Sequence, residues 1–99
     1  MFKIYDISMM ISEEMPVYKN KESKKPSIRT VQDFTTATAY ESRISLDVHT
    51  GTHLDAPLHM IEGGDTIETI PLEDLVGTAR VLDLTDVDGG IGRKELEPH

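Results

Sequence analysis

The stretch His49-Thr50-Gly51-Thr52-His53-Leu54-Asp55-Ala56-Pro57-Leu58-His59 holds three of the four histidines of the chain and one aspartate within eleven positions. Neutral imidazole and carboxylate groups are the usual ligands of zinc, manganese and ferrous iron in proteins. All four candidate ligands occupy odd positions, and alternate residues of an extended chain share one face. The even positions from 54 to 58 are apolar. The segment therefore predicts a polar metal-binding face with an apolar back.

A helix is the alternative conformation for this segment, because His49 and His53 have the i, i+4 spacing of helical neighbours. Gly51 and Pro57 argue against it, since glycine weakens a helix and an interior proline breaks one. We therefore expect the end of a strand that runs into a tight loop. Gly51 is expected to let the backbone bend close to the metal.

The residue types in this stretch suit metal-assisted hydrolysis. A catalytic zinc takes three protein ligands and keeps one position for water, and His49, His53 and Asp55 can supply the three. Zinc is the expected metal, manganese and iron are alternatives, and the two oxygens of Asp55 could bridge a second ion. His59 is left for proton transfer, because imidazole titrates near neutral pH, with ligation as its alternative role.

Composition limits the classes of partner. The chain has 99 residues and a formal net charge of −8, which disfavours nucleic acid as a partner because phosphate contacts need a basic face. It has no cysteine, which excludes disulfides and thiolate chemistry and is consistent with a cytoplasmic protein. No apolar run reaches the roughly 18 residues of a membrane span, so no membrane partner is expected. The apolar content of 37% fits a piece of something larger, or a homo-oligomer.

The remaining pattern predicts a strand-rich domain of the α/β or α+β class with short helices. Residues 28–36 are rich in β-branched side chains, and residues 40–49 alternate between apolar and polar side chains. Further strands are expected over residues 2–11 and 78–84. A short helix is expected after Pro71, and another is expected to begin at Arg93.

The four-lysine run over residues 19–25 is interpreted as a solvated loop, with a flap over the site as the alternative. Asp47 is interpreted as a solvated or salt-bridged acid, with support of a histidine as the alternative.

The stretch HTGTHLDAPLH resembles the HxGTHxDxPxH signature of the metal-dependent cyclase family, which includes bacterial kynurenine formamidases. Further segments resemble the same family, namely residues 5–8, 15–18, 63–64, 70–77 and 81–84. The resemblance covers essentially all 99 residues, and the family domain is about twice this long. It implies that residues 1–99 are the N-terminal portion of a single cyclase-like domain, with a C-terminal half as the missing partner. The implied fold is α/β, a β/β/α arrangement of mixed sheets with peripheral short helices.

The resemblance also implies roles for individual residues. His49, His53 and Asp55 would be ligands, with Asp55 shared between two metal ions, and His59 would transfer protons. Tyr18 stands where relatives place an aromatic residue, often tryptophan, near the substrate. The implied reaction is hydrolysis of a small amide such as N-formylkynurenine, a step of tryptophan catabolism, or a related ring-opening or ring-closing hydrolysis. In relatives, a histidine and a glutamate from the second half complete the site.

Two other classes of function stay open. His53 and Asp55 form a His-x-Asp pair, which with one more histidine would give the facial triad of a non-haem iron oxygenase. A non-catalytic module would instead hold one metal structurally, in a closed site that includes His59. A serine hydrolase is disfavoured, because the sequence has no G-x-S-x-G motif.

Overall fold

The computed structural model describes all residues from Met1 to His99 and divides them into two compact units, Met1–Ile67 and Glu68–His99. The elements in chain order are the 3-10 helices η1 (Tyr18–Asn20) and η2 (Glu22–Lys24), strands β1 (Ser27–Gln32) and β2 (Glu41–Ser45), 3-10 helices η3 (Pro57–His59), η4 (Ile67–Thr69) and η5 (Leu72–Leu75), and α1 (Arg93–Leu96). None of the helices has the length and apolar character needed to cross a bilayer.

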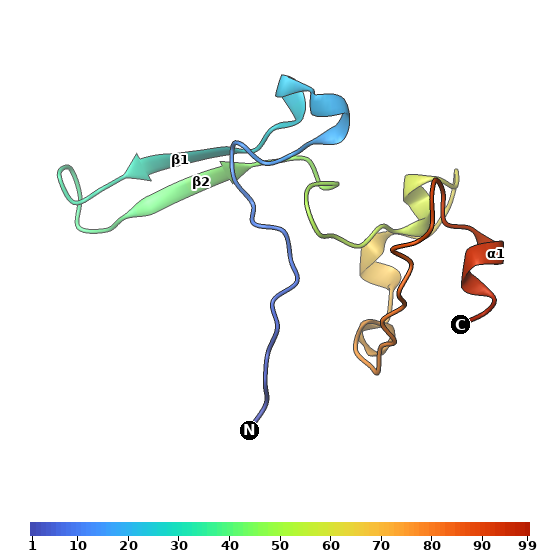
Figure 1. Cartoon of the computed structure of the whole chain (residues 1–99). Helices are drawn as coiled ribbons and strands as arrows, with labels where there is room; N and C mark the ends of the chain where they lie inside the picture. The colour runs from blue at the N-terminus through green and yellow to red at the C-terminus, as the bar shows by residue number, and fades with distance from the viewer. The chain divides into compact units, whose positions relative to one another are not determined.

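Strands β1 and β2 form an antiparallel hairpin, drawn as the pair of arrows in Figure 1. Ser27 pairs with Ser45 at the open end, and the register shifts by a bulge between Thr30 and Gln32. Both strands were expected from the sequence, and both are shorter than predicted. The reason at the turn is local hydrogen bonding: the Asp33 carboxylate accepts bonds from the Thr35 backbone N–H (2.9 Å) and hydroxyl (2.5 Å), which ends the ladder.

The outer edge of β1 is tied to the segment that precedes it. The backbone N–H of Ile28 donates to Glu13 Oε1 over 2.9 Å, so an edge donor of the hairpin has a side-chain acceptor. An edge strand with free N–H groups is open to pairing with another chain. The carboxylate of Glu13 therefore protects part of this edge and ties the hairpin to the segment that precedes it.

The small core of the first unit lies beside the start of the candidate metal-binding stretch, residues 49–59. Met15, Pro26 and Thr50 are its buried residues, and Met15 keeps only 4% of its surface exposed. The Thr50 hydroxyl donates to the backbone carbonyl of Asp47 over 2.5 Å, which satisfies it in its buried position. The beginning of the metal-binding stretch is therefore held from inside the unit.

The strand predicted over residues 2–11 is not formed. These residues have no regular secondary structure, and side chains such as Phe2 (95% exposed) and Ile7 (91% exposed) meet solvent. A strand needs a partner for its backbone groups, and in this chain β1 and β2 pair only with each other. One tie is present, from the Met9 N–H to Thr52 Oγ1 over 2.9 Å, and it joins this segment to the metal-binding stretch.

In the second unit the short helix predicted after Pro71 is confirmed, in the tighter 3-10 form of η5. The helix predicted from Arg93 is also confirmed, and it begins with a bond from the Gly92 N–H to Glu95 Oε2 over 2.7 Å. The strand predicted over residues 78–84 is absent, again because no partner strand lies in this chain. Its end is instead a turn, where Asp83 accepts bonds from the Thr85 N–H and hydroxyl over 3.1 and 2.6 Å.

Candidate metal centre and its cavity

The stretch of residues 49–59 is shaped by one left-handed residue and one proline. Gly51 has a φ of +62°, which L-residues with a side chain rarely adopt, so the expected bend at this position is confirmed. The space there is also tight: a Cβ at Gly51 would lie 3.0 Å from Ile11 Cδ1 and 3.2 Å from Met15 Cε. Pro57 then opens η3, which carries His59. Loop and helix together return the chain toward His49.

Three of the four candidate ligands converge on one another. His49 Nδ1 lies 2.7 Å from Asp55 Oδ1 and 3.2 Å from His53 Nε2, and His53 Nε2 lies 3.1 Å from the same oxygen. Two ligand atoms at about 2.0–2.1 Å from a tetrahedral zinc are about 3.3–3.4 Å apart. The two separations from His53 Nε2 lie close to this value, the one between His49 and Asp55 is shorter, and the chemistry of the three donors fits a divalent metal ion.

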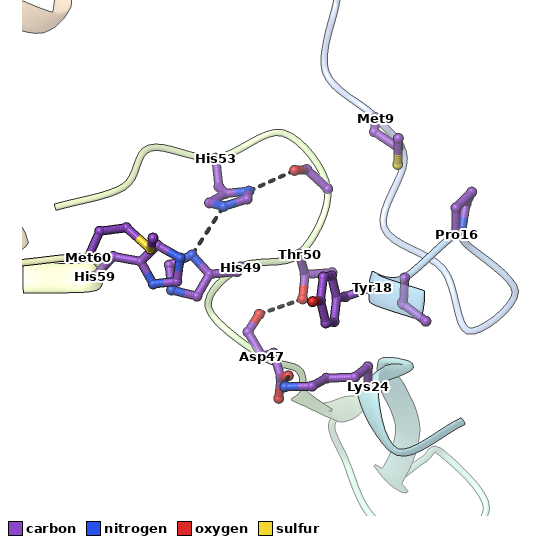
Figure 2. A pocket seen from close by; sticks show the side chains of 12 residues that line it. Met9, Pro16, Tyr18, Lys24, Asp47, His49, Thr50, His53, His59 and Met60 are labelled. Carbon is purple, nitrogen blue, oxygen red and sulfur yellow. Dashed lines mark hydrogen bonds and ion pairs between the residues drawn. The ribbon is translucent and has the colours of Figure 1, made fainter. Parts of the chain in front are cut away.

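His59 joins the same group from η3. Its ring centroid lies 3.7 Å from that of His49, and the ligand atoms of His49, Asp55 and His59 all fall within 4.8 Å of one another. Figure 2 shows the two rings overlapping beside His53. The structure thus brings all four residues together in two overlapping sets that share His49 and Asp55. The position of His59 fits both proton transfer and ligation.

The hydrogen bonds around the cluster select which nitrogen each imidazole presents. His53 Nδ1 lies 2.8 Å from the carbonyl oxygen of Gly51, which can only accept, so Nδ1 carries the proton and Nε2 is left with its lone pair. Such a bond from the far nitrogen of a histidine is the usual support of a metal ligand. His49 differs from His53, because it is Nδ1 of His49 that points toward the cluster.

The carboxyl group of Asp55 is held ionised. Loss of solvent contact by itself raises the pKa of Asp55, but the hydrogen bond with His49 and the electrostatic interactions with the surrounding imidazoles outweigh it, so the pKa lies below its ordinary value. Asp55 is therefore a carboxylate at neutral pH, the form in which it can bind a cation.

A cavity of about 760 Å³ opens in front of the histidines (Figure 2). His49, His53 and His59 line one side, and Tyr18 lies on the other, carried by η1. The two residues directly after Tyr18, Lys19 and Asn20, are both left-handed, each with a φ of +52°, and they turn the chain sharply there. The residue for which the family resemblance implied substrate contact therefore lies on the same cavity as the candidate ligands.

Sequence reasoning missed one part of the cavity wall. Lys24 belongs to the lysine run that was interpreted as a solvated loop, yet its Nζ lies 2.7 Å from Asp47 Oδ2, and both residues line the cavity. The salt-bridged interpretation of Asp47 is confirmed. The signal that could have found the pair is the hairpin register, since Ser27 pairs with Ser45 and these acidic and basic residues lie just beyond each strand end.

Several curated proteins are similar to part of this chain. A kynurenine formamidase of Bacillus mycoides is 38% identical over 55 residues, which are 56% of this chain and 26% of that protein. A kynurenine formamidase of Bacillus cereus matches with the same identity and the same coverage. The chain thus spans about a quarter of the length of the curated relatives it matches.

Two solved structures match nearly the whole chain. One is described as a potential metal-dependent hydrolase with cyclase activity, with a TM-score of 0.84 and 52% identity over 98% of this chain and 44% of the other. The second, a "predicted metal-dependent hydrolase" from Bacillus stearothermophilus, has a TM-score of 0.76 and 52% identity over 97% of this chain and 45% of the other. The expected cyclase-like fold is thereby confirmed, and the two-stranded sheet with short helices is the share of it that this chain holds.

Three independent observations agree on the family of this chain. The residue pattern of the stretch 49–59 resembles the signature of one family, its side chains converge in the structure, and the solved relatives share the fold. The model of the Cyclase family, described as "Putative cyclase", matches residues 5–99, and this chain therefore belongs to the Cyclase family.

Proposed function

We propose that residues 1–99 form the N-terminal metal-binding portion of a metal-dependent hydrolase that cleaves C–N bonds of small amides. The observation that carries the proposal is the convergence of His49 Nδ1, His53 Nε2 and Asp55 Oδ1, with no pair more than 3.2 Å apart. Relatives described as kynurenine formamidase and as metal-dependent hydrolases support this class of reaction. The same support favours a hydrolase over an iron oxygenase.

In this proposal His49, His53 and Asp55 hold the metal ion. Two imidazole nitrogens and a carboxylate oxygen suit zinc, with manganese and iron as alternatives. A divalent cation there supplies a water of lowered pKa and polarises the substrate carbonyl. The second oxygen of Asp55 would be left as a donor for a second ion, completed by residues outside positions 1–99.

His59 is the proposed proton-transfer residue, and Tyr18 is the proposed substrate contact. A neutral imidazole on the cavity wall can take the proton of the attacking water and return it to the departing nitrogen. The ring of Tyr18 offers a flat apolar surface to an aryl group across the cavity. The small-molecule substrate is therefore proposed to be an arylformamide of the N-formylkynurenine kind.

Assembly is part of the same proposal. Large apolar side chains of residues 1–11 are exposed in this chain, with Phe2 and Ile7 more than nine-tenths exposed. Contiguous exposed apolar surface marks contact with other protein. We propose that the remainder of the domain and a second copy of the protein cover it, in a homo-oligomer.

The experiment that tests the function compares two substitutions by metal content and by turnover of an arylformamide. Asp55→Ala is expected to abolish stoichiometric metal binding, with Asp33→Ala in the hairpin turn as the matched control. His59→Ala is expected to keep the metal and lose turnover by ~10²–10⁴-fold, the scale of general acid–base catalysis. The exposed His99→Ala is its control.

Two outcomes would contradict the assignment. Unchanged metal content in Asp55→Ala would remove Asp55 from the ligand set. Loss of metal in His59→Ala would make His59 a ligand and favour a closed, structural site.

A further inference from the structure

We propose that Lys24, held in place by Asp47, is a specificity-determining residue that binds a carboxylate group of the substrate. The inference rests on the proposed function, because it names a substrate class for the same cavity. Lys24 and Asp47 lie on the cavity wall together with Tyr18 and the histidine cluster, as Figure 2 shows.

The ammonium group is fixed relative to the metal-binding stretch. Lys24 Nζ lies 2.7 Å from Asp47 Oδ2, and the carbonyl oxygen of Asp47 accepts the hydroxyl of the buried Thr50 over 2.5 Å. Thr50 directly follows the first candidate ligand, His49. A group bound at Lys24 is therefore oriented by the same backbone that places the metal site.

The ammonium group has donors left for a ligand. Lysine carries three N–H donors, and the ion pair with Asp47 occupies one. The side chain is 43% exposed and faces the cavity, so a carboxylate that enters can accept from the donors that remain. Hydrogen bonds between two charged groups are shorter and stronger than neutral ones.

Stability does not account for a cation at this position. Ion pairs with about this exposure contribute little to folding, because water and salt screen them. The chain as a whole carries a net charge of −8, which repels anions, so an acidic substrate needs a local cation on the wall it meets. The neighbouring Lys25 pairs with Glu22 and does not line the cavity.

The test uses two arylformamides of the same shape, 3-formamidobenzoate and 3-formamidobenzamide, with the metal-loaded protein. Lys24→Met is expected to raise KM for the carboxylate about 10- to 100-fold, the scale of a hydrogen bond to a charged group, with little change in kcat. KM for the uncharged amide should not change.

Lys25→Met is the matched control, because it removes the same charge one residue away and outside the cavity. Lys24→Arg, which keeps the charge, should retain most of the preference.

A binding measurement separates this inference from the proposed function. Benzoate and benzamide are titrated calorimetrically into the parent protein and Lys24→Met, and only benzoate binding should weaken. Absence of turnover of both formamides would refute the proposed function, and the titration would still decide the role of Lys24. An equal rise in KM for both substrates, or benzoate binding equal in parent and Lys24→Met, would overturn the inference. If Lys24→Met does not fold, Lys24→Gln replaces it and is judged by the same criteria.

Discussion

The hairpin and the metal-binding stretch follow each other directly in the chain, and they are built in opposite ways. The hairpin has a hydrogen-bonded ladder with one bulge, yet its side chains are largely exposed, as Ile44 is at 58%. Residues 49–56 have no regular secondary structure, yet their side chains contact one another at hydrogen-bond distance. The difference shows that the geometry of the candidate site depends on one left-handed turn and a few side-chain bonds. The ladder instead sets the distance between the residues that lie beyond its open end.

The largest effect is expected at Gly51. Gly51→Ala forces a side chain into the left-handed region, which costs ~1–2 kcal/mol, and crowds Ile11 and Met15, which adds ~1–3 kcal/mol. We expect the free energy of unfolding to fall by about 2–5 kcal/mol and metal affinity to fall with it. Urea unfolding and metal titration measure the two quantities.

Gly63→Ala is the matched control for this substitution. Gly63 also has a positive φ, +72°, but a Cβ there would meet nothing within 4 Å. Only the backbone cost of ~1–2 kcal/mol is expected, with metal affinity unchanged. Equal losses of metal affinity in the two variants would show that the turn at Gly51 has no special part in the site.

A smaller effect is expected from Thr52→Val, which removes the acceptor of the Met9 N–H without changing side-chain shape. We expect a loss of about 0.5–1.5 kcal/mol, the net value of one hydrogen bond, and faster hydrogen exchange at the Met9 amide. Thr30→Val in the hairpin is the comparison, because it removes only an exposed hydroxyl contact with Tyr40. Valine suits a strand, so little change is expected there. A larger loss in Thr30→Val would reverse the contrast between the two regions.

The smallest effect is expected in the hairpin turn. The hydroxyl and then the backbone N–H of Thr35 hold the pKa of Asp33 below its ordinary value of 3.8. Since the folded-state pKa is the lower one, the stabilisation is present above pH 3.8 and is lost as pH falls through the folded-state pKa. Thr35→Val should raise the pKa of Asp33 part of the way back, as followed by NMR of the carboxyl carbon. The pKa of Asp83, held by Thr85, is the internal control and should not move.

Sequence alone predicted the parts of the molecule whose physics is local. The two strands of the hairpin follow from β-branched content and alternation, and the bend at Gly51 follows from residue type. The convergence of His49, His53 and Asp55 was predicted from ligand chemistry and parity, although the parity argument assumed an extended strand that the loop replaces. The roles of these residues and of His59 stay predictions.

The parts that sequence did not predict depend on partners distant in the chain. Residues 2–11 and 78–84 have strand-like composition, but a strand forms only against another strand, and composition does not say where that partner lies. The same limit applies to Lys24, because a polar run is interpreted as solvated when the residue that it contacts is unknown. Its contact with Asp47 depends on a register that residue types alone left open.

The pairing of Ser27 with Ser45 has a kinetic consequence. It brings Lys24 and Asp47 together by closing one hairpin, so this wall of the cavity needs no segment outside residues 24–47. Isolated hairpins close in about 1–10 μs, far faster than pairings between remote strands. The charged wall can thus assemble by closure of the hairpin, independently of metal uptake, whereas the contacts among His49, His53 and Asp55 depend on the turn at Gly51.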